Sequence, residues 1–480
     1  MGYPHYLGYG EAGQRDGQSY PGFRWAIVSS VTEDGIAEVY DLINATPFQN
    51  FFASGFLVHN CPYSCDFCDW GSATQSKVYT FDEERILAEF QWAGTHRIRF
   101  LYSADANFGI LKRDESLTEA LVKTKAQYGS PVEYRAAYAK NSGERVFQIG
   151  KTLAAAGMCK GVTLSFQSLD PHTLQAIHRS NIKIDDFAQW MRRYYAAGIP
   201  TYTELILGLP GETYKSFKAG IDQLLDAGQH EHLNIYLCQC LPNSELADPA
   251  YRAKHGLQTV VTPILQQHST VTTEALQELH EIVIATNTMP LADWKRTYLF
   301  AWAVQTFHCL GLLRCVAMYI RERYQLPYSC FYEELLNFAS SHSDTLIGRQ
   351  YAGAVAVMER ALAGGSWDVL VPAAGPIIWP SEEAAFLELV RALPVMYAEL
   401  DERLLRWNEP GDGLMQDLLQ YQQAMVVAPF DGWPRELETG ELMTCVVKHV
   451  LLQHNWHAWF QALLRGEPVP LERGEYVLEI

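Results

Sequence analysis

The sequence lacks several features that would assign it to a special class of protein. Its 480 residues contain 10 cysteines, three of them clustered too closely to act as disulfide staples. This indicates a reducing cytoplasm. Lys and Arg number 37 against 55 Asp and Glu, a formal net charge of −18 that disfavours a nucleic acid partner. No internal repeat is visible, and 48% hydrophobic with 19% charged residues is typical of an ordinary globular protein.

Targeting and membrane signals are also missing. The N-terminus has no basic region followed by an apolar stretch, so we expect no secretory signal. The most apolar segment runs from Tyr298 to Ile320 and includes Gln305, His308 and Arg314. Lipid would leave these polar groups without partners. We therefore predict a buried helix here and no membrane contact.

The length of the chain allows two or three domains, and the pattern changes along it. Residues 1–22 have no period and are predicted to be a loose tail, whereas 23–60 show short β segments separated by turns. Residues 61–245 alternate between strand and helix patterns, which predicts parallel α/β structure. Residues 246–480 have a mostly helical period without clear strands, which predicts a separate α-helical domain.

Five strand-like runs stand out in the α/β segment. They lie at 98–104, 133–139, 161–168, 201–209 and 232–241. Helical patterns separate them, and several of these end in glycine, the usual residue just beyond a helix. Because the carboxyl ends of parallel strands gather catalytic groups, polar residues after these runs are candidate site residues.

Cys61, Cys65 and Cys68 form a C-x3-C-x2-C run, with Phe67 just before the third cysteine. Three thiolates at this spacing can hold three corners of a four-iron, four-sulfur cluster and leave the fourth iron open to a small molecule. A zinc-stabilised module without catalysis is the alternative. Structural zinc usually needs four protein ligands, and the next cysteine, Cys159, has no paired partner.

Over residues 61–245 the chain resembles the radical S-adenosylmethionine (SAM) superfamily. The resemblance implies part of a TIM-type parallel barrel, with the cysteine triplet as cluster ligands. It also implies contacts with SAM. Phe67 would pack near the adenine and Glu204 would bind the ribose. The methionine amino group would be bound by Ala104, Asp105, Ala106 and Asn107, and the methionyl part by Gln167, Ser168 and Arg179.

Each of these residues also has a structural interpretation. Asp105 could cap a turn, and Gln167 and Glu204 could be polar groups of the barrel interior with their hydrogen bonds satisfied. The segment Gly208 to Thr213 could be a turn in which Thr213 caps the next helix. The order of the motifs and their positions at strand ends favour the radical SAM interpretation.

The resemblance implies a concrete reaction. SAM binds the open iron through its amino and carboxylate groups, and one electron from the reduced cluster releases a 5′-deoxyadenosyl radical. An electron donor such as flavodoxin or ferredoxin would supply that electron. The protein would orient a small-molecule or peptide substrate and exclude competing reactions. The region after residue 246 is then a candidate lid or substrate platform.

The motifs look most like the cobalamin-associated branch of the superfamily, many of whose members are C-methyltransferases. Those proteins usually carry a cobalamin-binding domain before the barrel. Ahead of Cys61 there is no D-x-H-x-x-G segment in a doubly wound pattern. We therefore expect cobalamin, if it is used, to arrive with an upstream partner.

The segment 38–61, EVYDLINATPFQNFFASGFLVHNC, resembles the C-terminal end of an intein. In that reading Asn60 cyclises to cleave the bond to Cys61, His59 polarises the peptide group, and Cys61 is the thiol nucleophile. Gln49 occupies a position where histidine is common, which predicts slower splicing. A native β-hairpin that happens to end in His-Asn is the alternative.

No start of an intein precedes this segment. The prediction is therefore a split intein, with a separate N-terminal protein that carries the other half. Barrels of this superfamily commonly have six strands, so the partner would also supply the first strand. Cys61 would serve first in splicing and later as a cluster ligand, and the unspliced chain would be a poor catalyst. The alternative is a complete radical SAM enzyme without cobalamin whose N-terminal extension is structural.

Overall fold

The computed structural model describes most of the chain from residue 65 onward. The described residues are 51–53, 56–58, 65–68, 80–103, 105, 107–139, 143–270, 277–407, 413–426 and 449–479. The predicted tail at 1–22 lies outside them. Strands β1 (Phe51–Ala53) and β2 (Phe56–Val58) pair antiparallel, at the positions where two short β segments were predicted.

Five parallel strands follow, at the five predicted positions. They are β3 (Phe100–Tyr102), β4 (Glu133–Arg135), β5 (Val162–Thr163), β6 (Thr201–Leu207) and β7 (His232–Leu237). β3 pairs with β4, and β6 pairs with both β5 and β7. A parallel bridge between Tyr134 and Cys159 joins the two groups. Among the described residues, no strand pairs with the other edge of β3.

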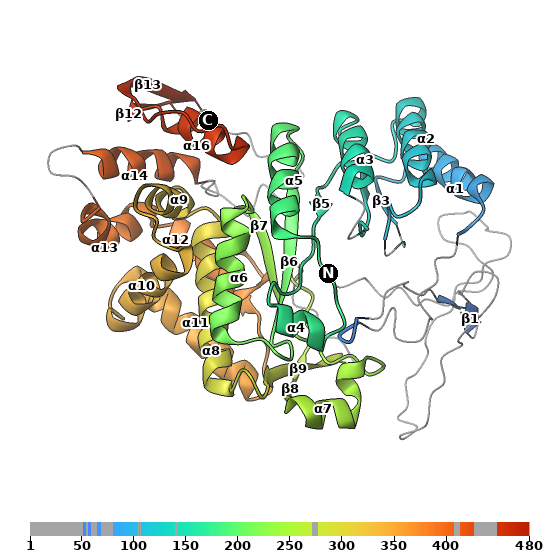
Figure 1. Cartoon of the computed structure of the whole chain (residues 1–480), viewed down its shortest axis with the longest axis horizontal. Coiled ribbons are helices and arrows are strands. Elements are labelled where there is room, and N and C mark those ends of the chain that lie inside the picture. Colours follow the sequence, from blue (N-terminus) through green and yellow to red (C-terminus); the bar gives the residue numbers. More distant parts are fainter. Residues whose placement is uncertain are drawn as a thin grey trace.

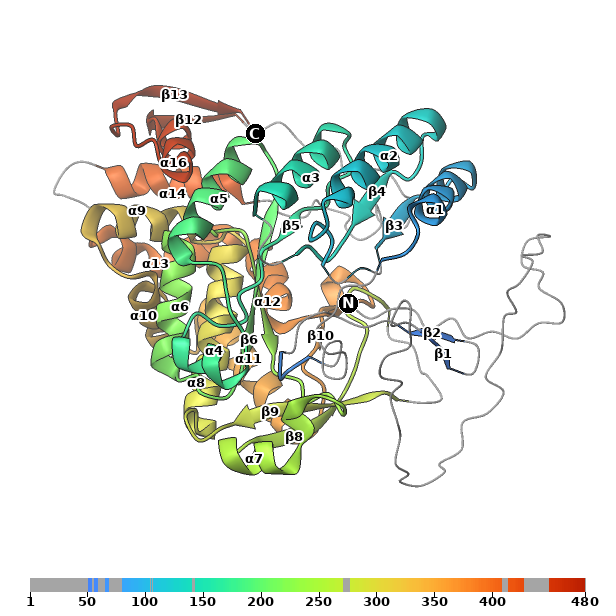
Figure 2. The same ribbon diagram turned by 45° about the vertical axis from the view of Figure 1, so that its right-hand side comes forward.

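Helices connect these strands at the positions of the predicted helical patterns, and the short helix α4 was not predicted. They are α1 (Glu83–Thr95), α2 (Arg113–Tyr128), α3 (Gly143–Ala155), α4 (Pro171–Ala176), α5 (Ile184–Ala196) and α6 (Tyr214–Asp226). Thr213 caps α6 through a reciprocal capping box with Ser216. α1, α2 and α3 lie on one side of β6 and β7, and the helices after residue 290 lie on the other (Figure 1, Figure 2).

The region after residue 246 is rich in helices. They are α7 (Pro249–His255), α8 (Leu291–Ala303), α9 (Arg314–Tyr324), α10 (Tyr328–Ser341), α11 (Leu346–Leu362), α12 (Ser381–Val390), α13 (Leu393–Leu405), α14 (Leu414–Met425) and α16 (Trp456–Arg465). Shorter 3-10 turns lie at η2 (Glu245–Ala247) and η4 (Pro372–Ala374), and η3 (Val304–Cys309) is a π-helix.

The mostly helical character predicted for this region is present, but it also contains strands that the sequence pattern did not show. Three antiparallel pairs interrupt the helices: β8 (Gln258–Pro263) with β9 (Leu279–Ala285), β10 (Val369–Leu370) with β11 (Ile378–Trp379), and β12 (His449–His454) with β13 (Arg473–Glu479). β9 also continues the central sheet, since the Cys240 amide donates to the Glu281 carbonyl and the Val283 amide to the Cys238 carbonyl, both at 2.8 Å.

The largest hydrophobic cluster runs across residue 245. It joins Phe217 and Leu224 of α6 to Trp294 and Phe300 of α8. At the edge of β7, the Ile235 amide donates a 2.7 Å hydrogen bond to the side chain of Gln305 in η3. The sheet and the C-terminal helices therefore share one core.

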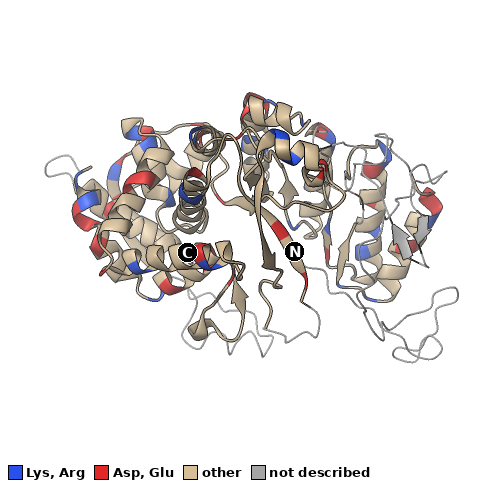
Figure 3. Cartoon of the chain, turned by 90° about the horizontal axis from the view of Figure 1, so that it is seen from below, with Lys and Arg blue, Asp and Glu red and all other residues tan. Residues whose placement is uncertain are grey.

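No single described helix is long and apolar enough to cross a membrane. Helices Leu291–Cys309 and Arg314–Tyr324 meet the length and composition test only as a pair, and they are bent by 97° relative to each other. Most of this segment is buried in the core, as predicted for 298–320. In the view of Figure 3, basic and acidic residues are interspersed along the helices.

Candidate active site at the carboxyl ends of the strands

Cys65 and Cys68 stand on one tight turn before α1. The Cys68 amide donates a 2.9 Å hydrogen bond to the Cys65 carbonyl, so that Asp66 and Phe67 form the corner. Cys65 is buried and Cys68 is half-buried. The third predicted ligand, Cys61, lies outside the described residues, within which no three His, Cys, Asp or Glu side chains could hold a metal ion.

Arg179 connects the cysteine turn to β5. Its Nε donates to the Phe166 carbonyl at 3.1 Å, and its Nη2 donates to the Ser165 carbonyl at 2.6 Å. Burial lowers the pKa of the guanidinium, and its contacts with Cys65 and Glu204 act in the opposite direction. The guanidinium therefore places a buried positive charge next to Cys65 and near Cys68, two of the predicted cluster ligands.

Glu204 lies at the centre of the site, on the half-buried face of β6. Its Oε2 accepts a 2.5 Å hydrogen bond from the Ser165 hydroxyl, and its carbonyl accepts from the Gln167 amide at 2.8 Å. Gln167 has φ of +67°, a left-handed conformation that costs a side chain of this kind about 1–3 kcal/mol. Its Oε1 is buried without a hydrogen-bond partner among the described residues.

A pocket of about 200 Å³ brings several predicted residues together. Its walls are Phe67, Gln167, Glu204, Ile206, Tyr236, Leu237, Cys238, Gln239 and Leu241. Phe67 also packs on an apolar cluster that includes Leu209 and Leu246. The structure therefore places an aromatic ring, a buried amide oxygen and a carboxylate around one cavity beside the cysteine turn.

Other predicted residues have structural contacts in this chain. The Ser168 hydroxyl donates to Glu212, which in turn accepts from the Ser216 hydroxyl. Asp105 Oδ1 accepts from the Asn107 amide at 2.8 Å and so caps the turn after β3. Neither Asp105 nor Asn107 lines the 200 Å³ pocket. Ala104 and Ala106 lie outside the described residues, as do His59 and Asn60, so their roles stay predictions.

Sequence reasoning missed Tyr236 and Cys238 as pocket residues. Tyr236 stands opposite Ile206 in the β6–β7 register, on the same face as Glu204. Burial and then the nearby Glu204 carboxylate raise the pKa of Tyr236. Tyr202 is on this face too, and its hydroxyl accepts a 3.2 Å hydrogen bond from Arg135 Nη2. The alternation of Tyr202, Glu204 and Ile206 was the sequence signal for this inner face.

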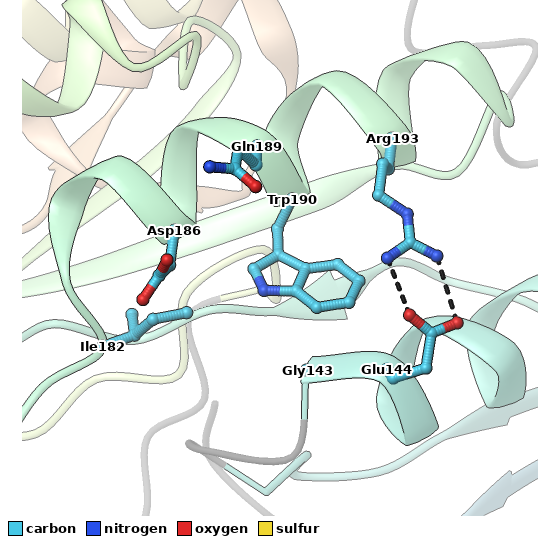
Figure 4. Close-up of a pocket in the computed structure, with 7 residues that line it drawn as sticks. All are labelled: Gly143, Glu144, Ile182, Asp186, Gln189, Trp190 and Arg193. Carbon is cyan, nitrogen blue, oxygen red and sulfur yellow. Dashed lines mark hydrogen bonds and ion pairs between the residues drawn. The ribbon is translucent and has the colours of Figure 1, made fainter.

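A second pocket, of about 400 Å³, lies between α3 and α5 (Figure 4). Trp190 forms one wall, and Arg193 pairs with Glu144 at 2.7 Å. None of the predicted site residues lines it. The chemistry predicted from the sequence therefore belongs to the pocket beside the cysteine turn.

Residues 56–224 match the family model described as the radical SAM superfamily. This segment belongs to the radical SAM superfamily. The superfamily uses a four-iron, four-sulfur cluster and SAM, and the thiols, buried guanidinium and polar pocket described above fit these two groups.

Two curated relatives of this chain are methyltransferases by name. It is 35% identical to the cobalamin-dependent radical SAM methyltransferase TokK of Streptomyces tokunonensis, over 88% of this chain and 63% of the relative. It is 34% identical to the 2-(S-pantetheinyl)-carbapenam-3-carboxylate methyltransferase of Streptantibioticus cattleyicolor, over 88% of this chain and 65% of the relative. The chain thus spans less than two thirds of the length of either relative.

Among solved structures, the radical SAM methyltransferase TsrM of Kitasatospora setae aligns with this chain at a TM-score of 0.39 and 14% identity. That alignment covers 51% of this chain and 50% of TsrM.

Proposed function

We propose that the chain is the catalytic part of a cobalamin-linked radical SAM C-methyltransferase that modifies a small molecule or peptide. The observation that carries the proposal is the arrangement of Cys65, Arg179, Gln167 and Glu204 around one site, in a segment that belongs to this superfamily. The names of the relatives favour methyl transfer. A reducing cytoplasm is part of the proposal, and it is compatible with the lack of a disulfide among the described cysteines.

In this proposal each residue of the site has a defined task. Cys61, Cys65 and Cys68 hold the cluster, which when bound supplies the electron that cleaves SAM to a 5′-deoxyadenosyl radical. Arg179 stabilises the thiolates and fixes the end of β5. Glu204, held by Ser165, binds the ribose hydroxyls, and Phe67 packs against the adenine.

The contacts of Gln167, Ser168 and the segment 104–107 divide into two kinds. Gln167 Oε1 has an open acceptor position, which suits a donor on the methionyl part of SAM. Ser168 is engaged with Glu212, so we assign it to the support of the β5 end. Asp105 and Asn107 stay candidates for the methionine amino group through the turn that they form.

The test is anaerobic reconstitution of the spliced protein, or of the intact chain where no splicing occurs, with iron and sulfide, followed by electron paramagnetic resonance and by assay of 5′-deoxyadenosine. The proposal expects a four-iron cluster whose spectrum changes when SAM binds, with flavodoxin or ferredoxin as electron donor. A bound zinc ion, which is silent in this spectrum, with no nucleoside formed would overturn the proposal in favour of a zinc-stabilised module.

We further propose that the chain is made as the C-terminal precursor of a split-intein protein. The sequence before Cys61 and its β1–β2 pair support this. The partner would supply the first barrel strand and a cobalamin domain, in keeping with the part of the relatives that this chain does not cover.

Splicing can be tested by mass spectrometry of the natural product. Splicing removes residues 1–60 and places new sequence directly before Cys61, and Asn60→Ala should block release. An intact N-terminus in cells that contain the upstream protein would instead favour a complete enzyme with a structural extension. If splicing does occur, cobalamin should co-purify with the spliced protein and not with the separate precursor chain.

A further inference from the structure

One residue inside the cysteine run, Asp66, fastens the turn to distant parts of the chain. Its carboxylate is buried, with 4% of the side chain exposed, and both oxygens lie near His178 Nδ1, at 2.8 and 2.9 Å. A buried carboxylate is costly unless such partners compensate it. The position between two cluster cysteines therefore contains an ionisable group with specific contacts.

The backbone amide and carbonyl groups of Asp66 are both hydrogen-bonded to distant residues. The Asp66 amide donates to the Ile177 carbonyl, and its own carbonyl accepts from the Leu246 amide, each at 3.3 Å. These bonds join the turn to the end of α4 and to η2. The next residue after His178 is Arg179, which contacts Cys65. Residues 177–179 thus contact the turn at both Cys65 and Asp66.

Tyr251 of α7 is a further residue that lies against Asp66. Its hydroxyl donates a 2.9 Å hydrogen bond to the Ala176 carbonyl and lies beside the Asp66 carboxylate, which helps to raise the pKa of the phenol. The tyrosine ring lies against His255, with the ring centres 4.5 Å apart. Tyr251 therefore joins α7 to α4 directly and also lies against the Asp66 carboxylate of the turn.

His178 has a backbone conformation that supports a specific role for this contact. Its φ is +49°, in the left-handed region that residues with a side chain rarely adopt. Such strain persists where surrounding contacts hold the residue in place, and it concentrates at functional sites. Here it directs the imidazole to Asp66, although most of the His178 side chain is exposed.

We propose that Asp66 is a positioning residue, which fixes the Cys65–Cys68 turn to α4 and α7 and thereby sets where these thiolates stand. The effect of Asp66 on an iron–sulfur cluster rests on the proposed function, but its role in attaching the turn to α4 and α7 does not. A structural interpretation, in which Asp66 only adds general stability, predicts that its loss affects the core and the turn alike.

The decisive experiment measures alkylation of individual cysteines by iodoacetamide in the metal-free full chain, read by mass spectrometry. Cys65 is 7% exposed and Cys315, in the main core, is 8% exposed, so that they are matched reporters. Asp66→Ala should raise the rate at Cys65 relative to Cys315 by about tenfold, as expected for loss of a charged hydrogen bond. Tyr251→Phe should raise the same ratio by a smaller factor.

Asp82→Ala is the control, because Asp82 caps α1 at an exposed position and makes no contact with the turn. Asp66→Asn retains one acceptor oxygen and should recover part of the protection. Adding Tyr251→Phe to Asp66→Ala should have a smaller effect than Tyr251→Phe alone, because one of the two neighbours of the hydroxyl is already lost. If Asp66→Ala exposes Cys315 as well, that variant has lost its fold in general. The Cys65 to Cys315 ratio of alkylation rates in Asp66→Asn and Tyr251→Phe then decides between the two interpretations.

A Cys65 to Cys315 ratio unchanged in all three variants would overturn the proposal. With cluster assembled, the same variants should lose iron faster to a chelator than the Asp82→Ala control. Selective exposure of Cys65 in these variants, with no 5′-deoxyadenosine formed by the unmodified spliced protein, would contradict the proposed function and leave the role of Asp66 standing. The two failures are thus distinguishable.

Discussion

The Ser165 hydroxyl donates a 2.5 Å hydrogen bond to the Glu204 carboxylate, across the parallel pair formed by β5 and β6. The bond holds the carboxylate on the half-buried face of β6, where it lines the 200 Å³ pocket. A hydroxyl can satisfy only one of the acceptor positions of a carboxylate. Glu204 therefore retains acceptor capacity toward a ligand in the pocket.

We predict that Glu204→Gln weakens SAM binding by about tenfold to a hundredfold, the usual range for loss of a charged hydrogen bond to a ligand. Iron content should not change, because the carboxylate is not a cluster ligand. Equilibrium dialysis against labelled SAM checks this. Glu144→Gln, at an exposed pair with Arg193, is the matched control. Equal affinity in both variants would remove Glu204 from the cofactor site.

Cys65→Ala should abolish formation of a four-iron cluster and of 5′-deoxyadenosine, because two thiolates leave two irons without protein ligands. Iron and sulfide analysis of the reconstituted variant is the measurement. Cys159→Ala should behave like the unmodified chain, since burial raises the pKa of this thiol and keeps it protonated. A brown, active Cys65→Ala protein would contradict the assignment.

Stability should fall as pH rises through about 7 because of Glu382. Burial, together with Glu383 and Asp368 nearby, raises the pKa of Glu382 to about 7 from 4.5. The folded state therefore retains a proton that the unfolded state loses above pH 4.5, so the stabilisation is full below pH 4.5 and is lost through pH 7. The loss amounts to roughly 3 kcal/mol.

Urea unfolding from pH 4.5 to 8 tests this with Glu382→Gln, which should reduce the decline relative to the unmodified chain. Glu402→Gln, at an exposed position of α13, should leave the decline unchanged. The idea fails if the pH dependence of Glu382→Gln matches that of Glu402→Gln.

Gln305→Ala should destabilise the fold by about 1–3 kcal/mol, the cost of a buried backbone donor left without a partner. The side-chain oxygen of Gln305 accepts from the Ile235 amide at the edge of β7. Urea unfolding measures the change in free energy. Gln148→Ala, which removes an exposed hydrogen bond to Glu144, should cost less than about 0.5 kcal/mol. Comparable losses would show that Gln305 does not protect this edge.

The order of strands and helices between residues 80 and 245 was predictable because each element carries its own period. The run at 201–209 alternates buried and half-buried residues in the structure, and Thr213 caps the helix that follows. The strands near 133 and 161 are shorter than predicted. After these short strands the chain no longer follows the regular hydrogen bonding of the sheet. Gln167 there adopts a left-handed conformation that no hydrophobic pattern encodes.

Strand β9 was not predictable in the same way. It is hydrogen-bonded to residues 238–240 about 40 positions earlier in the chain, so its partner is set by tertiary packing. The same holds for Gln305, whose neighbours in sequence are apolar and indicate only a buried helix. Its contact with Ile235 appears when the π-helix meets the sheet edge.

The sequence by itself determined the cysteine spacing, the alternating α/β order and the identity of the polar residues at strand ends, because local periodicity and ligand spacing are properties of neighbouring residues. Only the tertiary structure decided which of these side chains meet. It turned Ser168 toward Glu212, placed Tyr236 beside Glu204, and joined Asp66 to His178, 112 positions away. Contacts between such distant residues depend on how the helices and strands pack, which no local pattern specifies.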